Sequence, residues 1–115
     1  MRENIVEEKS FEFAVRIVKL CRYLEEKKEF VISKQLLRCG TSIGANIAEA
    51  QFGQSKADFR TKMQIALKEA NETRYWLRLL CATEFLEQKQ YKSMRKDVDD
   101  VISLLAAICK TAEQD

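Results

Sequence analysis

The sequence contains no histidine and no proline, and only three of its 115 residues are glycine. Histidine is the commonest general base and metal ligand in proteins, so its absence removes the usual machinery of hydrolases and of most zinc and iron sites. Turns usually need proline, glycine, asparagine or aspartate, so the scarcity of proline and glycine argues against a sheet with many turns. These absences favour a few long helices with short connections, and they argue against an enzyme.

Closely spaced cysteine pairs and long apolar runs are also missing. The four cysteines (Cys21, Cys39, Cys81 and Cys109) form no C-x-x-C pair, and a zinc site would need four distant thiolates. Each lies in or beside an apolar stripe, where a reduced thiol behaves as a small hydrophobe. We therefore expect no metal and no cofactor. The start, MRENIVEEKSFEF, does not resemble a signal peptide, and no run approaches the roughly 18 apolar residues of a membrane span. We expect a cytoplasmic protein.

What is present is helical periodicity, in four segments joined by short connections. Apolar residues recur every three or four positions in each segment, as on the buried face of an amphipathic helix. The four stripes are Phe13, Ile17, Leu20 and Leu24; Leu36, Leu37, Gly40, Ile43, Ile47 and Ala50; Phe59, Met63, Ala66, Ala70, Thr73 and Leu77; and Tyr91, Met94, Val98, Val101, Ile102, Leu105, Ile108 and Cys109. Short connections make consecutive helices antiparallel. The sequence predicts one all-α domain, 1–115, folded as an up-down-up-down four-helix bundle.

The expected helix ends follow from the serines and glycines. Ser10, Ser33 and Ser55 are candidate N-caps of the first three helices, and Gly53 fits the end of the second. Residues 1–9 are charged, so we expect them to be loosely ordered. Gly40 and Gly44 lie four apart in a stretch of small residues, which indicates that another helix packs very closely against the second one.

Basic residues are concentrated in the middle of the chain. Residues 16–78 hold 13 lysines and arginines against 7 acids, although the net charge of the chain is only +2. Such a segment can face phosphates, or it can be an ordinary solvated helix surface. The candidate nucleic-acid contacts are Arg38, Lys56, Arg60, Lys62, Arg74 and Arg78. Tyr75 and Trp76 point about 100° apart on their helix, so one can face outward beside Arg74 and Arg78. An outward ring there stacks on a base or, as the more favoured alternative, fills a subunit interface.

A second group of polar residues lies in otherwise uncharged helical neighbourhoods. It consists of Asn46, Glu49, Lys68, Glu69 and Glu72. We interpret it as a semi-buried polar network that fixes helix register, with Lys68 as the expected partner of Glu49. Plain solvent exposure is the alternative, and catalysis by these carboxylates is the least favoured. The third helix also carries more apolar positions than one four-helix core needs, which indicates an oligomer.

The segment 35–50, QLLRCGTSIGANIAEA, resembles the signature of a bacterial four-helix-bundle family that includes proteins encoded in intervening sequences of 23S ribosomal RNA genes. The resemblance continues through SKADF at 55–59, IALKEANET at 65–73 and YWL at 75–77, and so covers essentially the whole chain. The sequence departs from the pattern at Ala50, where many members carry glycine, and around Gly53, where many carry arginine.

The resemblance implies a homopentamer. A distant relative, the accessory variability determinant of diversity-generating retroelements, is a basic pentamer that binds a reverse transcriptase and nucleic acid. We therefore expect a non-enzymatic homo-oligomeric binding protein, a pentamer by preference, that contacts RNA or an RNA-associated protein through a basic surface. The alternative is a structural or protein-interaction adaptor with no nucleic-acid role. Arginines clustered around a pore would favour nucleic acid, whereas scattered arginines paired with glutamate or aspartate would favour the adaptor.

Overall fold

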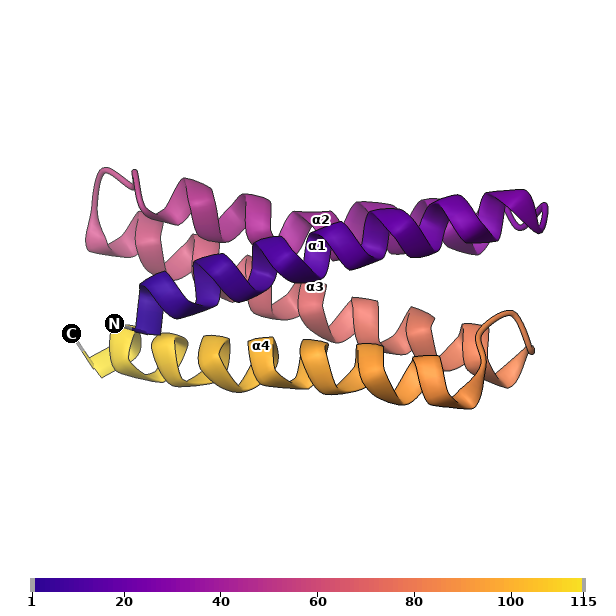
Figure 1. The fold of residues 1–115 in the computed structure, drawn as a ribbon. Coiled ribbons are helices and arrows are strands. Elements are labelled where there is room, and N and C mark those ends of the chain that lie inside the picture. The colour runs from indigo at the N-terminus through magenta and orange to yellow at the C-terminus, as the bar shows by residue number, and fades with distance from the viewer. Residues whose placement is uncertain (1, 115) are drawn as a thin grey trace.

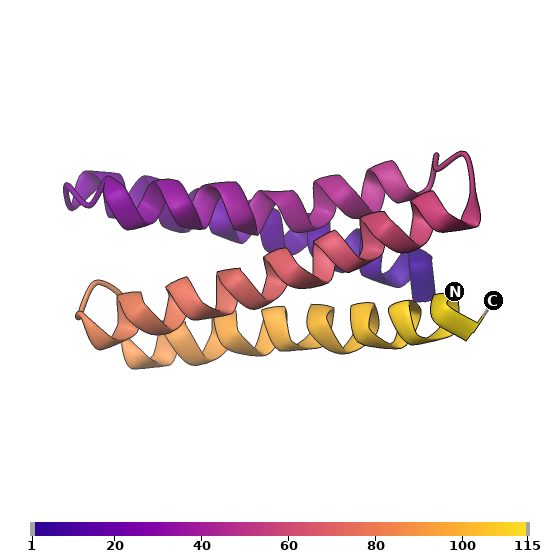
Figure 2. The same cartoon turned by 180° about the vertical axis from the view of Figure 1, so that it is seen from behind.

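The computed structural model describes the backbone of residues 2–114 and the side chains of residues 4–114. It consists of four helices, α1 (Arg2–Glu26), α2 (Val31–Ala50), α3 (Lys56–Ala82) and α4 (Gln88–Gln114), and the described chain contains no strand. The all-α class is therefore confirmed. Figure 1 shows the α2–α3 loop at the same end of the bundle as both termini, and the other two loops at the opposite end. Seen from behind in Figure 2, α3 runs from the end of α2 across to α4.

The four apolar stripes meet along the axis of this bundle. α1 packs on α2 and α4, and α3 packs on the same two helices from the other side. The predicted stripes of α3 and α4 are buried almost throughout, with Phe59, Tyr91 and Ile102 partly covered at the edge of the core. In the predicted stripe of α2, Leu37 is an exception, because its side chain remains 38% exposed. Leu37 therefore does not belong to the core.

Glycine in α2 allows the close helix contact that the small residues predicted. A Cβ atom added at Gly40 would lie 2.8 Å from Cγ2 of Ile17, which is too close for any real contact. At Gly44 the nearest atom is Oγ of Ser10, at an ordinary 3.4 Å. Of these two glycines, Gly40 therefore has the tighter contact with α1, through the side chain of Ile17.

Two predicted N-caps are wrong. α1 begins at Arg2, and Ser10 lies buried inside it with its hydroxyl donating to the Glu7 carbonyl oxygen at 2.9 Å. Residues 2–9 are therefore helical and Val6 belongs to the core, whereas Met1 lies outside the described residues. α2 begins two residues before Ser33, whose backbone N–H is capped by a carboxylate oxygen of Glu29 at 2.9 Å.

The N-cap of α3 is confirmed, because Oγ of Ser55 accepts a hydrogen bond from the Asp58 N–H at 3.1 Å. Gly53 lies three residues beyond the end of α2 and does not adopt the left-handed conformation of a glycine C-cap. Residues 83–87 connect α3 to α4.

Candidate nucleic-acid interface

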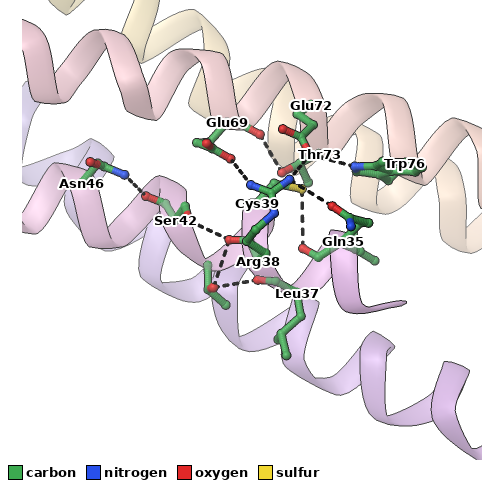
Figure 3. Close-up of polar contacts among 12 residues, drawn as sticks. Gln35, Leu37, Arg38, Cys39, Ser42, Asn46, Glu69, Glu72, Thr73 and Trp76 are labelled. Atoms are coloured by element: carbon green, nitrogen blue, oxygen red, sulfur yellow. Dashed lines mark hydrogen bonds and ion pairs between the residues drawn. The ribbon is translucent and has the colours of Figure 1, made fainter. Parts of the chain in front are cut away.

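A polar network joins α2 to α3 around Arg38 (Figure 3). The Arg38 guanidinium lies between two carboxylates of α3, with Nη1 3.3 Å from Oε2 of Glu69 and Nη2 bonded to Oε2 of Glu72. Nη2 also donates to Oε1 of Gln35 at 3.2 Å. Oε2 of Glu72 accepts a second bond, from Nε1 of Trp76 at 3.0 Å. The charge of Arg38 is thus balanced by carboxylates of α3, and this residue links α2 to α3.

The remaining members of the predicted network do not join it. Asn46 donates from Nδ2 to the Ser42 carbonyl oxygen at 2.8 Å, one turn back on its own helix. Glu49 is exposed and pairs with Lys62, whose Nζ lies 2.8 Å from Oε2. Lys68 is exposed on α3. The predicted Glu49–Lys68 pair is therefore wrong, and the network that does form is built on Arg38, Glu69 and Glu72.

The six candidate nucleic-acid contacts separate into two groups. Four lie on α2 or on the first half of α3. Arg38 and Lys62 are paired with carboxylates. Arg60 donates to the Ala112 carbonyl oxygen at 3.4 Å, and Lys56 is exposed in the first turn of α3. These four do not form one basic patch. Arg74 and Arg78 lie elsewhere, on the face shared by α3 and α4.

Arg74 and Arg78 line an open depression of about 520 Å³ between α3 and α4. We call it the arginine–tyrosine groove; its lining residues are Asn71, Arg74, Tyr75, Arg78, Tyr91 and Arg95. Three guanidinium groups and two phenol rings therefore share one concave surface. Among the described residues that line the groove there is no carboxylate.

Hydrogen bonds fix most of the groove. Asp99 bridges two arginines: its Oδ1 lies 3.1 Å from Nη1 of Arg74, and Nε of Arg95 lies 3.1 Å from its Oδ2. Nη1 of Arg95 donates to the Tyr91 hydroxyl at 2.9 Å. Arg78 is exposed, and among the described residues it has no ion pair and no side-chain hydrogen bond. The groove thus has an ordered wall and one unpaired guanidinium.

Sequence reasoning missed Tyr91 and Arg95 as members of this surface. The pattern placed Tyr91 in the core stripe of the fourth helix, and Arg95 lies one turn from Asp99, with which it forms an ion pair. Both groove residues lie more than ten positions from Arg78 along the chain. Only the packing of α4 on α3 brings them to it.

The described residues give little support for a metal site or a reactive thiol. Within the described residues no group of three histidine, cysteine or acidic side chains is placed to hold a metal ion. Burial raises the pKa of the Cys21 and Cys39 thiols to about 11, and burial also raises the pKa of Cys109, so these thiols are protonated and poorly nucleophilic at neutral pH. None of the described helices is long and apolar enough to cross a membrane.

Comparisons with known proteins place the chain in a family. A solved structure from Bacteroides thetaiotaomicron, described as a protein of unknown function from the S23 ribosomal protein family, is 58% identical. The alignment covers 96% of this chain and 99% of that one, with a TM-score of 0.93. No curated protein sequence matches. The model of the 23S rRNA-intervening sequence protein family matches residues 2–107, as the helix-two signature indicated, and this chain belongs to that family.

Proposed function

We propose that this protein is a non-enzymatic RNA-binding protein of the cytoplasm that contacts its ligand through the arginine–tyrosine groove. The supporting observation is the composition of that groove: three arginines, two tyrosines and no lining carboxylate among the described residues. Guanidinium groups pair with phosphate oxygens, and aromatic rings stack on bases. The family's description ties its members to 23S rRNA genes, which supports RNA as the class of ligand.

Exposed lysines extend the basic surface beyond the groove. Lys68 lies seven residues before Tyr75, two turns along the same face of α3, and Lys92 lies one turn before Arg95 on α4. Asp99 offsets one of the three guanidinium charges. The net charge of the groove and its flanking lysines remains positive, although the net charge of the whole chain is only +2. Binding through such a surface weakens as salt rises, because each phosphate contact releases counterions.

Charge reversal tests the proposal. Fluorescence anisotropy with a labelled single-stranded RNA should show binding by the unaltered protein and a loss of roughly tenfold or more for Arg78→Glu. Lys34→Glu makes the same charge change at an exposed site on α2 and is the matched control. The slope of log affinity against log salt should fall by about one for Arg78→Glu alone. Equal effects of the two substitutions would show that the groove is not the site.

A protein-interaction adaptor is the second candidate, and an apolar surface favours it. Phe11, Ala14, Val15 and Val18 line a hollow on α1, with Lys19 and Arg22 also in its lining. Phe11 is 69% exposed. The pairing of Arg38 and Lys62 with carboxylates also fits the adaptor. Under this candidate no RNA binds, and the α1 surface contacts protein.

Self-association is part of our proposal under either candidate. We take the bundle as antiparallel, because short loops at alternate ends reverse the chain. The α1 surface is then available along one side, and burying it against further copies of the chain removes apolar area from water. The pentamer implied by the family resemblance is the state that we expect.

A further inference from the structure

Tyr75 is the groove residue that phosphate binding alone does not require. Its side chain is 57% exposed, and it follows Arg74 and precedes Arg78 by three residues, so that all three lie on one side of α3. An exposed ring beside guanidinium groups offers a flat apolar surface and nearby positive charge. That combination suits a base with its phosphate better than it suits a phosphate alone.

The ring of Tyr75 is held in place by a chain of contacts that begins on α2. Tyr75 meets Trp76 edge to face, with ring centroids 5.1 Å apart and planes at 74°. Trp76 packs partly against the core and donates to Glu72, and Glu72 is held by Arg38. A ring that is already fixed loses little conformational entropy when a ligand stacks on it.

The polar groups of the groove are occupied mostly by one another. Asn71 uses its Oδ1 to accept from Arg74 and its Nδ2 to donate to the Leu67 carbonyl oxygen, both at 3.1 Å. The Tyr91 hydroxyl accepts from Arg95. Few groups therefore remain to read the edge of a base, whereas Arg78 is unpaired and can take a phosphate.

We infer that the groove binds an unpaired nucleotide of single-stranded RNA, with the base stacked on Tyr75 and a neighbouring phosphate on Arg78, and that Arg38, Glu72 and Trp76 position the ring. In a duplex both faces of a base are covered by its neighbours, so only an unpaired base can stack on Tyr75. Stacking without edge contacts predicts tolerance of base sequence. The inference rests on the proposed function and names the form of RNA that the groove takes.

Anisotropy titrations of the full chain with a labelled RNA of roughly 12 nucleotides, alone and annealed to its complement, test the inference. The single strand should bind at least about tenfold more tightly than the duplex. Tyr75→Ala should remove roughly a tenfold factor from single-strand affinity, because stacking is lost, whereas Tyr75→Phe should retain it. Tyr23→Ala, at an exposed tyrosine of α1, is the matched control. Circular dichroism of each variant verifies that the fold is kept.

Different outcomes separate this inference from the proposed function. If Tyr75→Ala binds as the unaltered protein does while Arg78→Glu loses affinity, the groove holds phosphates only; the inference is overturned and RNA binding stands. Equal affinity for single strand and duplex also overturns it. If neither RNA form binds, the proposed function itself fails, and the adaptor that contacts protein through the α1 surface takes its place.

The positioning role has its own readout. Trp76→Phe keeps a ring beside Tyr75 but removes the donor to Glu72. We expect the ratio of single-strand to duplex affinity to fall by a few-fold, with helical content unchanged. An unchanged ratio would show that the contacts of Arg38 and Glu72 stabilise the fold but do not position the Tyr75 ring.

Discussion

Glu72 accepts hydrogen bonds from two directions, from Arg38 on α2 and from Trp76 on its own helix. Glu72→Ala leaves the indole N–H without its partner and removes one of the two carboxylates around Arg38. Because the site is only partly exposed, we expect a loss of about 1–2 kcal/mol in the free energy of unfolding. Urea denaturation followed by circular dichroism measures it.

Glu49→Ala is the natural comparison, because it removes the carboxylate of an exposed ion pair with Lys62. Its expected cost is at most about 1 kcal/mol. If Glu49→Ala proved the more harmful of the two, Glu49 would have structural partners that the ion pair with Lys62 does not account for.

Single side chains were where sequence reasoning was least successful. Arg38 and Glu69 belong to different helices, so their pairing depends on how α2 and α3 are rotated about their axes. Lys62 and Lys68 are almost two turns apart on α3, and nothing in the sequence specified which one lies opposite Glu49. Residue type indicated that these groups would be paired, but the choice of partner required the tertiary structure.

At the scale of whole helices the sequence was far more informative. The stripes of α3 and α4 were predicted correctly, because burial repeats every three or four residues along a long helix. The starts of α1 and α2 were not. Serine inside a helix can bond its hydroxyl to a carbonyl of the preceding turn, as Ser10 and Ser33 both do, and so resembles a cap without being one.

The contact between α1 and α2 gives a prediction at this scale. Gly40→Ala drives a methyl group into Ile17, and overpacking of this kind costs about 1–3 kcal/mol. Gly44→Ala meets only ordinary contacts and gains helix propensity, so it should be neutral or stabilising by up to about 1 kcal/mol. Thermal unfolding of both variants tests this. A more damaging substitution at Gly44 than at Gly40 would place the closest approach of the helices elsewhere.

For the whole molecule, the exposed apolar surface of α1 predicts assembly. Light scattering coupled to size exclusion should give a mass several times the 13.4 kDa of one chain. Val15→Asp places a charge in the α1 hollow and should shift the protein toward smaller species, because a buried unpaired carboxylate is costly. Ser103→Asp, on an exposed position of α4, should leave the mass unchanged. A monomer at micromolar concentration before any substitution would contradict the proposed assembly.

The central claim is that RNA meets this protein at the arginine–tyrosine groove, and photo-cross-linking tests it most directly. The protein would be irradiated with RNA that contains 4-thiouridine, digested with trypsin and analysed by mass spectrometry. We predict cross-links in the peptides that span residues 75–78 and 90–92, which carry Tyr75 and Tyr91. Cross-links concentrated instead in the peptide of residues 23–27 on α1, or none above the level of a non-binding control protein, would contradict the account.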